Sequence, residues 1–158
     1  MRGIGPQAFL GKNLSLQSTS LAPGQLVMYG YDPKFKDELP VYDKFPLLLP
    51  FSVDAKHFMG LNLHYIAPQY RIELLDKLLG FSKNEMIPDR LKMQLSWKYL
   101  QGIAKHKGIS YSVKQYLHGY VKTRFVNIPT KDWVIACYLP LARFEKKSEQ
   151  SVWAGMGR

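Results

Sequence analysis

Three strand-like runs lie close together between residues 24 and 65, and their spacing constrains the fold more than any other feature of the chain. The runs 47–53 and 58–65 are rich in apolar residues, and only the four residues 54–57 separate them. A linker of that length is typical of a β-hairpin. The sequence therefore predicts an antiparallel hairpin at the centre of the fold.

The first of the three runs, 24–31, is apolar on both faces of the strand that it predicts. Leu26 and Met28 fall on one face, whereas Val27 and Tyr29 fall on the other. A strand that is apolar on both sides is expected to be covered on both sides. We therefore expect this run to lie inside the domain.

Helical periodicity follows the hairpin. A proline in the first turn and a leucine stripe predict a helix over 68–79, capped by Gly80. A second helix is predicted over 88–105. A third is predicted to begin at Ser110 or Ser112, because apolar residues then recur in the i, i+3, i+4, i+7, i+8 pattern of a core-facing helix. These residues are Val113, Tyr116, Leu117, Tyr120 and Val121.

The C-terminal third is expected to return to the sheet. Residues 124–128 predict another strand, and 133–139 fit either a short helix or an apolar strand. These elements together predict an α+β domain, in which a small, strongly bent antiparallel sheet packs beside about three helices.

The chain of 158 residues has the usual length of one domain. We expect a flexible arm over 1–23, a globular domain over 24–147 and a polar tail over 148–158. The arm has no carboxylate and scattered apolar residues, so it either orders against a partner or stays disordered. Neither a secretory signal nor a membrane span is apparent, which predicts a soluble intracellular product.

Charge is the strongest functional indication. The chain has 22 lysines and arginines against 12 acids, a formal charge of +10. The 35 residues from 90 to 124 contain eight of these basic residues and no carboxylate. Solvated helices usually mix both signs, so a segment of one sign indicates an external anion. Nucleic acid is one such partner, an acidic protein is another, and a merely solubilising face is the third reading.

For nucleic acid, the expected phosphate contacts are the lysines and the arginine along this segment. They are Lys98, Lys105, Lys107, Lys114, Lys122 and Arg124.

The chain contains no complete catalytic or metal-binding motif, so we expect no enzyme activity, cofactor or metal. Cys137 lies in an apolar run and is expected to be a buried, inert thiol. His64 is better explained as a hydrogen-bonded sheet residue than as an acid–base catalyst. Asp37, Glu38 and Asp43 are interpreted as part of a polar loop, and would hold a metal only if the fold brought other ligands to them.

Four segments carry a resemblance to a known group of proteins: GQLVMYGYDPKFKDELPVYDKFPLLLPF, GLNLHYIAPQYRIELLDKLL, YLHGYVKTRFVNIPTKDWVIACYLPLARF and VWAG. In this order they resemble small structural proteins of contractile-tailed bacteriophages, of the DNA end protector type. The likeness spans about residues 24–154. The first strand and the hairpin are also similar to small SH3-like barrels, a class that includes some ribonucleases.

The phage resemblance implies a virion structural protein, made in the host cytoplasm and present in several copies among other virion proteins. Such a protein is expected to contact double-stranded DNA at packaged ends or at the head–tail connection. A tail or baseplate adaptor without DNA contact is the alternative. The barrel resemblance keeps a third possibility open, a nuclease on an SH3-like barrel.

Overall fold

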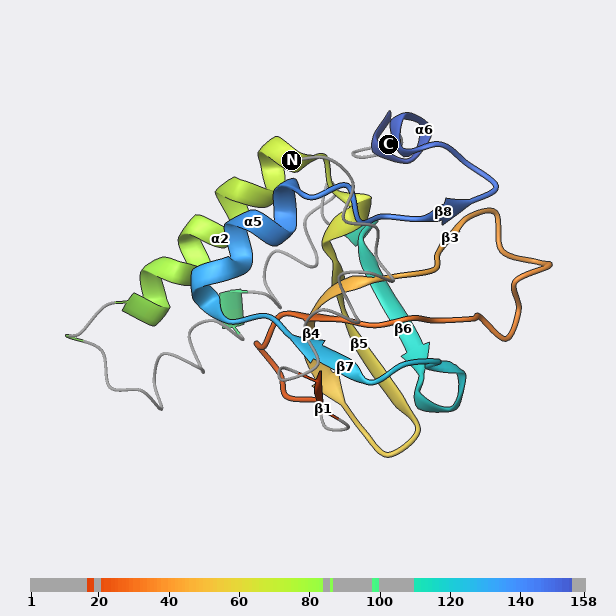
Figure 1. Ribbon diagram of the computed structural model, residues 1–158, viewed down its shortest axis with the longest axis horizontal. Helices are drawn as coiled ribbons and strands as arrows, with labels where there is room; N and C mark the ends of the chain where they lie inside the picture. Colours follow the sequence, from red (N-terminus) through yellow and green to blue (C-terminus); the bar gives the residue numbers. More distant parts are fainter. Residues whose placement is uncertain (1–16, 19–20, 84–85, 87–97, 100–109, 155–158) are drawn as a thin grey trace.

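The computed structural model describes residues 17–18, 21–83, 86, 98–99 and 110–154. A six-stranded antiparallel sheet forms its centre, in the order β1-β7-β2-β4-β5-β6 (Figure 1). The strands are β1 (Gln17–Ser18), β2 (Val27–Met28), β4 (Leu47–Val53), β5 (His57–Asn62), β6 (Val113–Leu117) and β7 (Phe125–Asn127). Because helices pack on this sheet, the α+β prediction is confirmed.

Strands β4 and β5 form the predicted hairpin, with Val53 opposite Phe58 next to the loop. Their register shifts between Pro50 and Ser52, a bulge that accommodates a proline inside a strand. A side chain at Gly60 would clash with the Leu49 carbonyl oxygen, and its Cβ would lie 2.7 Å from Pro50 Cα. Glycine is therefore required where β5 crosses the bulge.

The two faces of β2 and its flanking residues are both buried, as predicted. Leu26 and Met28 belong to a core cluster between the sheet and the helices. Val27 and Tyr29 belong to a second cluster, which is largely aromatic and includes Phe58. The alternating pattern thus correctly predicted burial of both faces of this strand, and the structure shows that two separate clusters cover them.

Two helices cover one face of the sheet and lie beside each other in Figure 1. The predicted helix at 68 is α2 (Pro68–Lys83), which continues through Gly80, so the predicted glycine cap is wrong. A glycine inside a helix costs only about 1 kcal/mol relative to alanine, which tertiary packing overcomes. Residues 133–139, for which two readings were open, form helix α5 (Trp133–Tyr138) after the 3₁₀ turn η4 (Thr130–Asp132).

The third predicted helix is wrong, because residues 113–117 form the edge strand β6. Five residue pairs join β6 to β5, from His57 opposite Leu117 to Leu61 opposite Val113. The 3₁₀ turn η3 (His118–Tyr120) then follows. Pairing with β5 satisfies the backbone and overrides a helical spacing of apolar residues, which is only a weak local preference. Most of the second predicted helix lies outside the described residues.

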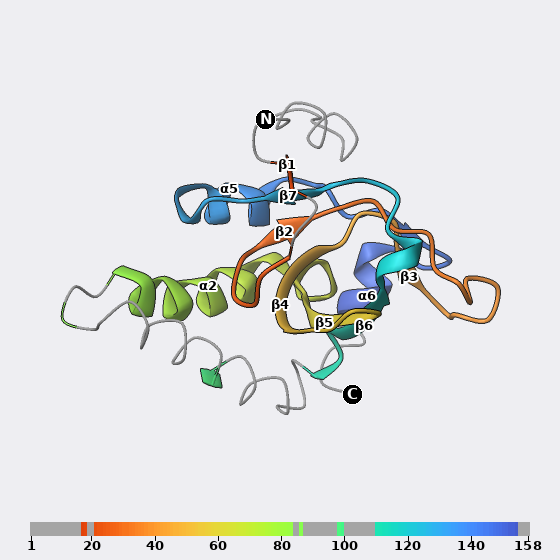
Figure 2. The same cartoon turned by 90° about the horizontal axis from the view of Figure 1, so that it is seen from below.

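The sheet curls strongly, but over the described residues it does not close into a barrel, so the SH3-like barrel expected as an alternative is not confirmed. Figure 2 shows β7 and β2 above the curl and β5 and β6 below it. Within the described part of the chain, the order ends at β1 and β6, and no ladder joins these two edges.

A second, small sheet supports the β6 side of the domain. It pairs β3 (Tyr42–Asp43) with β8 (Phe144–Glu145). Helix α6 (Glu149–Ala154) follows, and its Val152 is fully buried against Tyr65 in the 3₁₀ turn η2 (Leu63–Tyr65). The division into arm, domain and tail stays a prediction. Over the described residues, no helix has the length and apolar character needed to cross a membrane.

Candidate nucleic-acid interface

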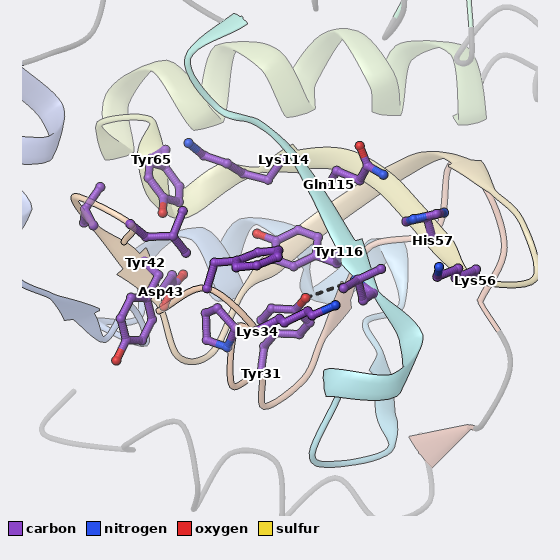
Figure 3. Close-up of a pocket in the computed structure, with 15 residues that line it drawn as sticks. Tyr31, Lys34, Tyr42, Asp43, Lys56, His57, Tyr65, Lys114, Gln115 and Tyr116 are labelled. Atoms are coloured by element: carbon purple, nitrogen blue, oxygen red, sulfur yellow. Dashed lines mark hydrogen bonds between the residues drawn. The ribbon is translucent and has the colours of Figure 1, made fainter. Parts of the chain in front are cut away.

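A pocket of about 460 Å³ opens at the β6 edge of the sheet (Figure 3). Its walls come from parts of the chain that are distant in sequence: β3 and the loop before it, the β4–β5 hairpin turn, η2 and β6. The antiparallel pairing of β5 with β6 brings the hairpin turn beside the end of β6. The pocket therefore exists only because β6 is a strand.

Tyrosines that belong to the aromatic core form the base of the pocket. The ring of Tyr116 stacks on Phe58, with 5.4 Å between the centroids, and meets the ring of Tyr31 edge to face at 4.9 Å. The backbone N–H of Leu117 donates to the Tyr31 hydroxyl at 3.0 Å. Since these rings are packed on other rings and tied to the strand, the base is rigid.

Lys114 is a half-buried cation in the pocket wall. Its Nζ lies 4.1 Å from the centroid of the Tyr65 ring and 5.1 Å from that of Tyr111. Burial lowers the pKa of this ammonium group. No carboxylate lies within ion-pair distance of it among the described residues. The two aromatic rings thus hold the ammonium group in place, and no carboxylate of the described residues occupies the position where an anion could pair with it.

Lys34, Lys56 and His57 add further basic groups around the pocket. The Nζ of Lys34 lies 5.3 Å from the ring centroid of Phe35, which is 55% exposed. In Figure 3, Lys56 and His57 lie at the opposite end of the pocket from Tyr65. These residues were not among the predicted contacts, although the run Pro33-Lys34-Phe35-Lys36 interleaves lysine with an aromatic ring as nucleic-acid surfaces do.

Asp43 is the one carboxylate that lines the pocket among the described residues, and groups of the protein itself balance its charge. Its Oδ2 lies 2.6 Å from Nδ1 of His64, and both side chains are fully buried. Its Oδ1 accepts from the backbone N–H groups of Phe45 and Arg143, each at 3.1 Å. Burial alone would raise the pKa of Asp43, but His64 and these amides outweigh it, so the pKa is lowered. The pocket lining therefore keeps a net positive charge.

Asn62 completes this buried network. Its Nδ2 donates to Asp43 Oδ2 at 3.2 Å and to the Tyr116 hydroxyl at 3.3 Å, while its Oδ1 accepts from the backbone N–H of His64 at 3.1 Å. The network joins β5 to β3 and to the base of the pocket. These hydrogen bonds rigidify the site, although Nε2 of His64 is buried without a hydrogen-bond partner among the described residues.

The structure confirms His64 as a hydrogen-bonded structural residue, although it lies in η2 and not in a strand. Its carbonyl oxygen accepts from Arg71 at 3.3 Å and from the Trp153 ring nitrogen at 2.9 Å. The expected burial of Cys137 is also confirmed, and desolvation raises the pKa of its thiol to about 12. Within the described ranges, no cluster of three or more metal-ligating side chains occurs.

Of the six predicted phosphate contacts, the structure brings two to adjoining hollows. Lys114 lines the pocket, and Lys122 lines a neighbouring hollow that shares Tyr31 with it. Arg124 is exposed just before β7, and Lys98 is exposed in a helical turn. Lys105 and Lys107 lie outside the described residues. Lys114 and Lys122 therefore belong to a strand and the loop after it, and not to the helix predicted there, whereas Arg124 directly precedes β7, near the start of the strand predicted over 124–128.

A comparison with protein families gives a match over nearly the whole chain. The profile described as "Phage T4 terminal DNA protecting protein" matches residues 8–155. Comparisons with curated proteins and with solved structures gave no match. The matched span covers the pocket, the buried network and every predicted phosphate contact.

Proposed function

Since the chain belongs to the phage T4 terminal DNA protecting protein family, we propose that it binds the ends of packaged phage DNA and shields them from exonucleases. It does so as a non-enzymatic virion component, made in the host cytoplasm and assembled with other virion proteins in several copies. Its place is at the packaged DNA end or the head–tail connection. The phage end-protector resemblance predicted from the sequence is confirmed by this family membership.

The family match is the single observation that carries the proposal, and the charge of the chain supports it. A formal charge of +10 favours a polyanion, and an acid-free segment that includes exposed Lys122 and Arg124 suits phosphate contacts. We assign such contacts to Lys98, Lys105, Lys107, Lys114, Lys122 and Arg124. Each contact displaces counterions from DNA, so binding is expected to weaken steeply with salt.

The test compares the same DNA sequence as a linear duplex and as a covalently closed circle. We expect tighter binding to the linear form, and a slower digestion of that form by an added exonuclease. Equal affinity for both forms together with unprotected ends would contradict end binding, and a tail or baseplate adaptor would bind neither form. Incubation with Mg²⁺ and no added nuclease is the check on enzymatic activity, since cleavage would overturn the non-enzymatic assignment.

Charge-removing variants then locate the contacts. The double variant Lys122→Gln and Arg124→Gln is expected to reduce the slope of log affinity against log salt concentration by about 2, or about 1 for each lost phosphate contact. Lys77→Gln is the matched control, because Lys77 is an exposed lysine on α2 and lies outside the pocket lining. An unchanged slope in the double variant would remove these two residues from the interface.

A further inference from the structure

We propose that the pocket at the β6 edge receives an unpaired terminal nucleotide of the DNA, with its phosphate beside Lys114 and Lys34 and its base against Phe35 and the tyrosines. This inference rests on the proposed DNA-end function and adds where and how the end is held. It follows from three properties of the pocket: its charge, its aromatic surface and its size.

The positive charge of the pocket indicates that an external anion binds there. Among the described residues, three lysines line it, Lys34, Lys56 and Lys114, against one acid, Asp43. His64 and backbone N–H groups already engage the oxygens of Asp43. Lys36, two residues after Lys34, contrasts with them because it pairs with Asp32 at 3.4 Å and does not line the pocket. The pocket lysines, in contrast, have no ion-pair partner among the described residues.

The aromatic surface indicates that the anion carries a flat ring. Phe35 is more than half exposed at the mouth, Tyr42 is half-buried, and Tyr31 and Tyr116 form a rigid base. Exposed aromatic rings beside lysines are the means by which proteins hold unpaired bases next to their phosphates. An inorganic phosphate or an acidic peptide would use the lysines and leave the exposed ring of Phe35 without a partner in the ligand.

The size of the pocket selects a single nucleotide over a duplex. Its volume of about 460 Å³ falls in the usual range for a small organic ligand, about 300–1,000 Å³. A base inside a duplex reaches such a pocket only by leaving its stack, and the free-energy cost is least for a nucleotide that is already unpaired. DNA ends supply such nucleotides, by fraying or as overhangs. A preference for ends therefore follows from the shape of the pocket.

The first experiment measures binding of small probes to the full chain by calorimetry. We expect thymidine 5′-monophosphate to bind more tightly than either thymidine or inorganic phosphate, since it alone engages the lysines and the rings together. Lys114→Gln is expected to weaken binding of the monophosphate about tenfold, the usual scale for loss of a charged hydrogen-bond partner. Phe35→Ala is expected to weaken it about fivefold or more through lost stacking. Lys36→Gln is the matched control and is expected to change nothing.

The second experiment uses duplexes of one sequence with blunt ends or with single-stranded overhangs. We expect the overhang to bind several-fold more tightly, and that advantage to disappear in Lys114→Gln and in Phe35→Ala. If linear DNA is still preferred over closed circles, but overhangs give no advantage and the monophosphate does not bind, this inference is wrong while end protection stands. Equal binding of inorganic phosphate and monophosphate would also overturn it. Loss of the preference for linear DNA would instead contradict the proposed function.

Discussion

Asp43 and Lys114 are charged groups that line the same pocket, yet the fold treats them in opposite ways. Asp43 is fully buried, and His64, Asn62 and two backbone amides engage both of its oxygens. Lys114 is half-buried, and among the described residues only aromatic rings contact its ammonium group. One charge is balanced inside the protein, whereas the other is held where a ligand can balance it.

The comparison shows how to separate structural from functional charge in this domain. Removing a buried charge that has a full set of partners is destabilising, because those partners are left unsatisfied. A cation on an aromatic surface without a carboxylate contributes little to stability, because the cation–π attraction is offset by desolvation. We therefore expect substitutions at the two positions to act on different measurements.

The largest effect is expected for Asp43→Ala. It would leave His64, Asn62 and two backbone N–H groups without their acceptor, and the free energy of unfolding is expected to fall by about 3–5 kcal/mol. Urea unfolding followed by circular dichroism measures this change. Asp37→Ala, at an exposed position in the preceding loop, is the control and is expected to stay within about 0.5 kcal/mol of the wild type. A small effect at Asp43 would mean that the network is not structural.

Acidification is also expected to lower the free energy of unfolding, but by less than Asp43→Ala does and gradually with pH. The pKa of Asp43 is lowered in the folded state from its ordinary value of 3.8, so its carboxylate stabilises the fold above about pH 4. This contribution is lost as the pH falls through the lowered pKa, where the folded state must take up a proton. Unfolding free energies measured from pH 6 to pH 3 are expected to fall less steeply in Asp43→Asn than in the wild type.

Asp54 provides the comparison for this titration. Backbone N–H groups of His57 and Lys56 lower the pKa of Asp54, but its carboxylate is exposed to water. Solvent screens such a group, so Asp54→Asn is expected to change the pH dependence much less than Asp43→Asn. An equal change in the two variants would contradict a special role for the buried carboxylate.

The smallest stability effect is expected for Lys114→Gln, which should stay within about 1 kcal/mol of the wild type in urea unfolding. A small change is expected because the lost cation–π contacts are compensated by removal of a desolvated charge. The same variant is the one expected to weaken nucleotide binding about tenfold. If the free energy of unfolding of Lys114→Gln fell by several kcal/mol, Lys114 would be a structural charge like Asp43, and the proposed difference between the two residues would be wrong.

Several elements were predictable because their patterns are local. The hairpin of β4 and β5 followed from two apolar runs with a short linker, and the start of α2 followed from a proline and a leucine stripe. The strand at 124–128 and the two-sided burial of the first strand were also correct. The helix predicted from Ser110 failed, since its apolar spacing also suits a strand that pairs with β5.

The sequence by itself determined the phage family, the α+β class and the excess of positive charge. Motif order, periodicity and composition are properties of the sequence alone and do not depend on contacts between distant segments. Only the tertiary structure decided that Lys34, Lys56 and Lys114 surround one pocket and that Asp43 does not cancel their charge. These facts depend on pairing between segments about 50 residues or more apart. A local pattern cannot specify such contacts, since the partner of a strand is set by the packing of the whole domain.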